Sequence, residues 1–261
     1  MLSNFRLDHY AEGITVILLA TTIVVVLQIY AKKVLGEDRI RQCHEVGGHY
    51  LAIVGGFYAV LLGLIVFAAM DKFIAAEKTV EEEGKSILAV YTMAAQFDSK
   101  GAEIQKKLKE YTDEVVNNEW ELMESDQISM TARKIFLGTL DMARKIEPIT
   151  ENQKALYPIM MTEMINTWDS RRDRTKVSNT GIPGAEWVIL IIGAVITLLL
   201  TFFFTIDSQG LHLIMTAMIA LLIFVSLYLV LLFSDPFSGD MRVSNHGLVI
   251  AQKIMNEYEW K

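Results

Sequence analysis

The stretch His44–Ile87, HEVGGHYLAIVGGFYAVLLGLIVFAAMDKFIAAEKTVEEEGKSI, indicates a helix that crosses a membrane and continues beyond it. From Gly47 to Met70 it carries no Asp, Glu, Lys or Arg, and about 20 apolar residues are enough to span a bilayer. An apolar stripe then continues among charged residues, at Phe73, Ile74, Val80, Ile87, Leu88 and Tyr91. The sequence therefore predicts one long helix that leaves the bilayer and ends at Phe97–Gly101.

Three further apolar runs predict three more membrane-spanning helices in this chain of 261 residues. They are Gly13–Tyr30, Trp187–Ile206 and Leu211–Phe233, and each is free of Asp, Glu, Lys and Arg. The first run is followed by the charged stretch Lys32–Arg41 rather than by a small-residue cleavage site, so we expect it to be retained rather than removed as a signal peptide.

Between the second and third spans the pattern is helical throughout. Apolar stripes predict helices near 104–120, 129–146 and 150–174, the last opened by a capping box at Thr150–Gln153. The predicted fold is an all-α membrane protein with four transmembrane helices and a helical cytosolic domain inserted between spans 2 and 3. The predicted segments are 1–70 for spans 1 and 2, 71–185 for the cytosolic domain, 186–234 for spans 3 and 4, and 235–261 for a cytosolic tail.

Charge sets the expected orientation and excludes one class of partner. The 31–46 loop carries four Lys or Arg residues, whereas nine lie near span ends on the opposite side, which predicts cytoplasmic termini and a cytoplasmic helical domain in the cell (inner) membrane. The net charge of −7 argues against nucleic-acid binding, which needs a basic surface. A single cysteine, Cys43, cannot form an intramolecular disulfide, so packing and oligomerisation must support the fold.

The motif HEVGGH has the residue types of a zinc site but not its spacing. His44 and His49 are five residues apart, which turns a helix by about 140° and points the two imidazoles to different sides. We therefore expect no metal and no cofactor. No Ser/His/Asp set, Cys/His pair or phosphate-binding glycine loop occurs in a usable context, so the chain is not expected to be an enzyme.

The second span carries two rows of residues that suggest different contacts. The small residues recur at intervals of four, three, four and four and predict close packing against a neighbouring span; they are Gly48, Ala52, Gly55, Ala59 and Gly63. On another side lie His49, Ile53 and Phe57, at i, i+4 and i+8, which are candidates for a pore and its gate. Core or lipid contact explains Ile53 and Phe57 equally well, and His49 also suits a membrane interface.

Charged clusters follow the second span and precede the third. The acids Glu77, Glu81, Glu82 and Glu83 are typical of a solvated helix face; as a ring in an oligomeric vestibule they would attract cations. The arginines Arg171, Arg172 and Arg174 either meet lipid headgroups or pair with these acids. Trp120 and Trp168 are expected in the core of the helical domain.

Together with His44–Ile87, three motifs resemble the bestrophin-like proteins of bacteria and archaea: RRDR at 171–174, IPGAEWVILIIGAVIT at 182–197 and DPFSG at 235–239. The resemblance implies a homo-oligomer, pentameric in the bestrophins, with cytosolic termini and an ion path lined by the second span. Gly56-Phe57-Tyr58 matches the bestrophin neck motif, which makes Phe57, Ile53 and His49 the neck candidates. At His49 bestrophins tend to have an apolar side chain instead.

The segment after the fourth span lacks the acids of a bestrophin calcium clasp. In DPFSGDMRVS only Asp235 and Asp240 are carboxylates, with Asp8 as a possible third, whereas calcium takes six to eight oxygen ligands. We expect no such clasp and instead expect Asp235 and Pro236 to terminate the span.

These features predict an oligomeric, passive ion channel that leans towards cations, with further copies of itself, membrane lipid and small inorganic ions as partners. Two alternatives stay open. One is an energy-coupling subunit resembling the proton-driven stators, which would need a partner carrying a membrane carboxylate. The other is a non-conducting scaffold or sensor.

Overall fold

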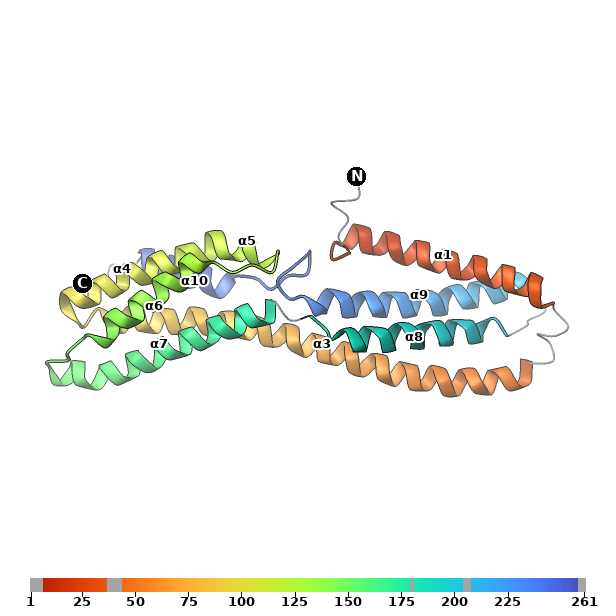
Figure 1. Ribbon diagram of the computed structural model, residues 1–261, viewed down its shortest axis with the longest axis horizontal. Helices are drawn as coiled ribbons and strands as arrows, with labels where there is room; N and C mark the ends of the chain where they lie inside the picture. Colours follow the sequence, from red (N-terminus) through yellow and green to blue (C-terminus); the bar gives the residue numbers. More distant parts are fainter. Residues whose placement is uncertain (1–6, 37–43, 179–180, 204–207, 258–261) are drawn as a thin grey trace. The chain divides into compact units, whose positions relative to one another are not determined.

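The computed structural model describes residues 7–36, 44–178, 181–203 and 208–257, and all regular structure in these ranges is helical. The elements are α1 (Tyr10–Leu35), α3 (His44–Ala94), α4 (Asp98–Glu114), the π-helix η1 (Val115–Glu119), α5 (Trp120–Met123), α6 (Met130–Arg144), α7 (Glu151–Ser178), α8 (Gly184–Thr201), α9 (Gln209–Ser234) and α10 (His246–Glu257) (Figure 1). Within the described ranges, four helices are long and apolar enough to cross a membrane: α1, α3, α8 and α9. The predicted all-α fold with four spans is confirmed.

The chain forms two compact units. We name Met1–Lys72, Ile182–Ser234 and Gly239–Met241 the spanning unit, and Phe73–Gly181, Asp235–Ser238 and Arg242–Lys261 the helical unit. The long helix α3 supplies residues to both units, as the unbroken stripe through Met70 predicted. The cytoplasmic place of the helical unit and the four predicted segments stay predictions.

The spanning unit consists of α1, α8, α9 and the first part of α3 (Figure 1). Aromatic side chains of one helix pack against glycines of another. A Cβ on Gly13 of α1 would lie 2.1 Å from the ring of Tyr228 on α9, and a Cβ on Gly193 of α8 would lie 2.4 Å from the ring of Tyr58 on α3. Such close approach requires glycine. The outward faces of all four helices stay apolar and exposed, which suits contact with lipid.

Aromatic rings in mutual contact form part of the core of the helical unit. Phe136 lies between Tyr111 and Trp168, with ring centroids 5.2 and 5.8 Å away, and Trp120 meets Phe237 edge to face at 5.7 Å. Trp120 is buried and Trp168 packs against the same core, which confirms the prediction for both. Their large apolar surfaces make such residues dominant in a core.

Local capping explains where helices of this unit begin. The Thr150 hydroxyl accepts from the Gln153 N–H, and Oε1 of Gln153 accepts from the Thr150 N–H, which confirms the predicted capping box. Ser129 caps α6 by accepting from the Ala132 N–H. Helix α3 ends at Ala94, shortly before the predicted Phe97–Gly101 break, and α4 begins at Asp98, whose φ is +48°.

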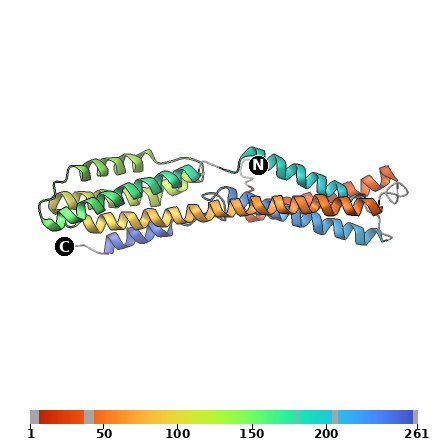
Figure 2. The same ribbon diagram turned by 90° about the horizontal axis from the view of Figure 1, so that it is seen from below.

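Helix α10 was not predicted; the sequence indicated only a cytosolic tail over residues 235–261. It packs beside the later part of α3 (Figure 2), where a Cβ on Gly84 would lie 2.5 Å from the carbonyl oxygen of Gly247. Its buried residues Leu248, Ala251 and Met255 belong to the core of the helical unit. Two facing glycines thus let two backbones touch.

Replacing Gly84 by alanine should lower the free energy of unfolding of the helical unit by about 1–3 kcal/mol, because the new methyl group meets backbone rather than a mobile side chain. The matched control is Gly138→Ala on α6, where a Cβ meets nothing within 4 Å and helix propensity should raise stability by about 0.5–1 kcal/mol. Thermal unfolding of both variants checks this. Equal stability changes in the two variants would contradict the packing of α10 on α3.

Candidate functional site

The residues predicted to line a pore form an exposed row on α3. Ile53 is 59% and Phe57 76% exposed, and His49 is exposed as well. Among the described residues of the spanning unit, Phe57 is the most exposed large apolar side chain. The contacts of α3 within this unit come instead from Tyr58 and Leu62, which are buried against α8 and α9. This face of α3 is therefore open to lipid, to another copy of the chain or to a water-filled axis.

The small-residue row borders an apolar groove between α3 and α9. Gly55, Ala59 and Gly63 line this groove, whose volume is about 500 Å³. A Cβ on Gly55 or Gly63 would meet nothing within 4 Å, so the close helix contact is not made there within the described part of the chain. Ala52 is exposed and Gly48 half-buried. Packing of this row against a neighbouring span stays a prediction.

Three of the four predicted vestibule acids face solvent. Glu77, Glu81 and Glu82 are exposed on α3, and Lys78 lies 3.6 Å from Glu82 in a surface pair of little energetic weight. The prediction is wrong for Glu83, which is fully buried. Its position one residue beyond Glu82 turns its side chain by about 100° into the core of the helical unit.

Glu83 belongs to a buried cluster of two carboxylates and two guanidinium groups. Nε of Arg174 donates to Oε2 of Glu83 at 2.6 Å, and Nη2 of Arg174 donates to Oε1 of Glu119 at 2.8 Å. Arg171 binds Glu119 through two parallel bonds of 2.6 Å. Tyr111 donates its hydroxyl to Glu83 at 2.5 Å. The charges cancel and the donors are matched to acceptors, which is the condition for ions to be stable in a core.

The neighbours of Glu119 and Arg174 favour the charged forms of these two side chains. Burial raises the pKa of Glu119, but Arg174 and Arg171 outweigh burial and hold that pKa below its ordinary value. Burial lowers the pKa of Arg174, and Glu83 and Glu119 reverse this and raise it. Burial, followed by the charge of Glu83, raises the pKa of Tyr111, so its hydroxyl stays a donor. Pairing of arginines with these acids was one of the two predicted roles, and it is confirmed for Arg174.

A second polar group lies inside the spanning unit. Gln28 of α1 and His212 of α9 are buried, with Nε2 atoms 2.9 Å apart, and Nε2 of His212 lies 3.2 Å from the carbonyl oxygen of Thr201 on α8. Polar side chains inside membrane spans tend to bond across helices. Sequence reasoning missed this group, although Gln28 and His212 are polar interruptions in otherwise apolar runs.

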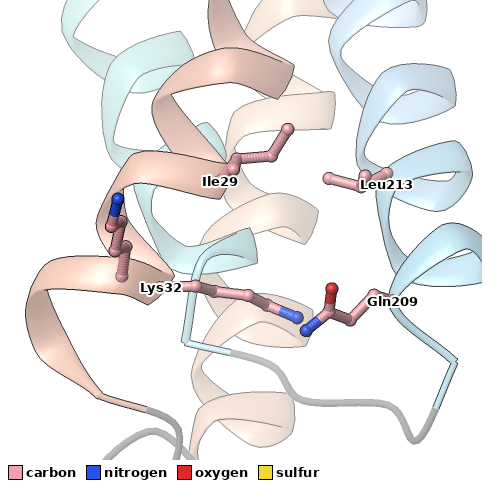
Figure 3. Close-up of a pocket in the computed structure, with 5 residues that line it drawn as sticks. Ile29, Lys32, Gln209 and Leu213 are labelled. Atoms are coloured by element: carbon pink, nitrogen blue, oxygen red, sulfur yellow. The ribbon is translucent and has the colours of Figure 1, made fainter.

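The end of α1 and the beginning of α9 enclose a pocket of about 290 Å³ lined by Ile29, Lys32, Lys33, Gln209 and Leu213. Figure 3 shows Lys32 extending from α1 towards Gln209. Both lysines lie in the last turn of α1, where cations complement the helix dipole.

The structure describes only some of the residues that were considered as metal ligands. Cys43 and the side chains of His44 and Glu45 lie outside the described residues. In the part that the structure describes, no group of three or more His, Cys, Asp or Glu side chains is placed to hold a metal ion. Helix α9 ends at Ser234, as Asp235 and Pro236 predicted, and both oxygens of Asp240 accept from nitrogen donors of His9 and Tyr10. The expected lack of a calcium clasp and of a zinc site stays a prediction.

The sequence of residues 18–248 matches the family model described as Bestrophin-like domain. No curated protein sequence matches the chain. Among solved structures, a point mutant of a bacterial Bestrophin homolog from Klebsiella pneumoniae aligns with a TM-score of 0.73 at 13% identity, over 94% of this chain and 99% of that chain. Another structure of this homolog gives 0.71 at 14% identity, over 92% and 97%. At such low identity the likeness shows a common fold and no more.

Proposed function

The chain belongs to the Bestrophin-like family, as its sequence motifs predicted, and on this premise we propose that it is a homo-oligomeric channel for passive ion conduction. Copies of the chain surround a central axis, in a pentamer as in the bestrophins, and α3 lines the path. The protein is a multi-pass membrane protein, and we place its termini and helical unit in the cytoplasm.

The observation that carries this proposal is the open face of α3. His49, Ile53 and Phe57 make a continuous exposed row, so they are free to face a shared axis without breaking any packing of the subunit. Rings of apolar side chains close a pore by expelling water. Phe57, Ile53 and His49 then form the neck of the path.

Selectivity for cations is proposed from the three exposed acids of α3. Glu77, Glu81 and Glu82 repeat in every copy of a ring, and a charged opening concentrates its counter-ions. Glu83 and Glu119 are paired with Arg174 and Arg171, so this cluster adds no net charge.

Ion flux into liposomes that contain only the purified protein tests this function. Gradients of potassium, sodium and chloride are applied separately, after correct insertion and oligomer formation have been verified. Cation flux without any other protein is expected. Flux that requires a second protein would favour the stator-like alternative, and silence under every condition would favour a scaffold.

Replacing Glu77, Glu81 and Glu82 together by glutamine should lower the ratio of potassium to chloride flux by roughly ten-fold, the lower end of the enrichment produced by a charged cleft. The matched control replaces three exposed acids of other segments, Glu103, Glu121 and Glu147, and changes the net charge equally. An unchanged ratio of potassium to chloride flux in the first variant, or an equal drop in the control, would show that these three acids do not determine selectivity.

A further inference from the structure

The first turn of α1 is capped by Asp240, which is distant in the sequence. His9 occupies the N-cap position with extended backbone, φ −93° and ψ 137°, but its side chain makes no capping bond. The first N–H groups of a helix have no partner within the helix and need an outside acceptor. Oδ2 of Asp240 supplies one by accepting from the Tyr10 N–H at 2.8 Å.

The other oxygen of the same carboxylate binds the residue before the helix. Oδ1 of Asp240 lies 2.9 Å from Nδ1 of His9, and the Asp240 N–H donates to the carbonyl oxygen of Asp8 at 3.2 Å. Gly239 makes the approach possible, because its φ is +72° and a Cβ there would lie 2.5 Å from the Asp8 oxygen. Three contacts therefore hold Gly239–Met241 on the start of α1.

One of these contacts depends on a proton. The hydrogen bond that His9 donates to Asp240 raises the pKa of His9, against a smaller opposing effect of burial, and the negative charges of Asp240, Asp8 and Glu12 add to the rise. His9 in turn lowers the pKa of Asp240, so this carboxylate stays charged near neutral pH. The side chains are 41% and 38% exposed, so protons reach both from water.

The other titratable groups beside His9 are phenols and carboxylates. Tyr10 follows it in the chain, and the Tyr228 hydroxyl of α9 donates to the His9 carbonyl oxygen at 3.1 Å. Phenols ionise near pH 10 and carboxylates near pH 4. Among the described groups around this contact, His9 is thus the one whose ordinary pKa lies near neutral pH.

We propose that His9 and Asp240 form a proton-operated latch that fixes the first turn of α1 to Gly239–Met241. With His9 charged, the bond to Asp240 is charge-assisted and the carboxylate is held in place as the cap of Tyr10. A group with a raised pKa contributes fully below its unfolded value, near pH 6.5, and loses its contribution as the pH rises through the raised value. The latch is therefore tight in mild acid and loose in mild alkali.

The effect stays local because other contacts hold the rest of α1. Gly13 packs against the ring of Tyr228, and Tyr228 also binds the His9 carbonyl oxygen whether or not the imidazole is charged. Loss of the charge loosens the first turn of α1 and Gly239–Met241 rather than separating α1 from α9. The latch is a device for sensing pH at one end of the spanning unit.

Hydrogen exchange of the full chain in lipid nanodiscs at about pH 6 and about pH 9 tests the latch, after correction for the intrinsic pH dependence of exchange. Peptides covering 7–15 and 236–245 should lose protection by about two- to five-fold at the higher pH, as expected for an exposed ion pair. In the His9→Asn variant, which keeps a neutral donor near the Nδ1 position, this loss should vanish. Peptides of α8 serve as the internal reference.

The same loss in the parent and in His9→Asn, or no loss in the parent, would overturn the latch. Asp240→Asn is the second variant: it should lower protection of both peptides at each pH and abolish the pH response, and a response equal to that of the parent would also count against the proposal. The measurement does not depend on ion conduction, so failure of the latch and failure of the proposed channel are separate results.

Discussion

Arg174→Met is expected to lower the free energy of unfolding by about 3–5 kcal/mol, the largest stability effect that the structure predicts for a single side chain. Arg174 is fully buried and binds both Glu83 and Glu119. A methionine fills similar volume but leaves two carboxylates in the core with a single guanidinium group, that of Arg171. The cost therefore comes from uncompensated buried charge rather than from lost packing.

Arg172→Met is the matched control on the same helix. Arg172 is 65% exposed and pairs at 3.5 Å with Asp169, an arrangement worth at most about 1 kcal/mol. Thermal unfolding followed by tryptophan fluorescence compares the two variants, and Trp120 and Trp168 are the reporters that lie in the core of the helical unit. Equal losses in the two variants would mean that the buried cluster does not stabilise this unit.

Acid should partly rescue the Arg174→Met variant. In the parent, Arg174 and Arg171 hold the pKa of Glu119 below its ordinary value near 4.3, so the stabilisation is complete above that value and is lost as the pH falls through the lowered pKa. Without Arg174 the buried cluster carries one uncompensated negative charge, and protonation of a carboxylate neutralises it. The stability gap between parent and variant should narrow from about pH 8 to about pH 5.

Helix positions were predictable wherever a local signal fixes them. The Thr150–Gln153 capping box, the Ser129 start of α6 and the end of α9 before Pro236 each depend on residues adjacent in the chain. The four apolar runs are equally local, because crossing a bilayer requires length and hydrophobicity alone. Helix α10 was missed even though Leu248, Ala251 and Met255 follow helical spacing, since its helix covers only twelve residues.

Contacts between distant residues were not predictable. Glu83 reads like its neighbours Glu81 and Glu82, and only the approach of α7 with Arg174 turns it into a core residue. Asp240 was considered only as one of too few carboxylates for a calcium clasp, and nothing in the sequence joins it to His9, 231 residues away. Charge and residue type identify candidate groups, whereas burial and partner depend on the tertiary fold.

Phe57→Ala is expected to increase ion flux by at least about ten-fold, which corresponds to a barrier lowered by about 1.4 kcal/mol. In the proposed ring, Phe57 from each copy narrows the neck and keeps it dry, and removal of the aromatic rings lets water and ions enter. The side chain is 76% exposed in the subunit, so truncation should leave the fold intact. Leu222→Ala on α9, at a position 69% exposed, is the control that should leave flux unchanged.

The claim that α3 lines the ion path is tested most directly by a single cysteine at position 57. Cys43→Ser first removes the one native cysteine, and Phe57→Cys is then compared with Leu222→Cys in liposomes before and after a water-soluble, cationic thiol reagent. We predict that Phe57→Cys raises flux, that the reagent then blocks it, and that Leu222→Cys responds to neither change. Flux that is unaffected by modification at position 57, with labelling verified by mass, would contradict a path along this face of α3.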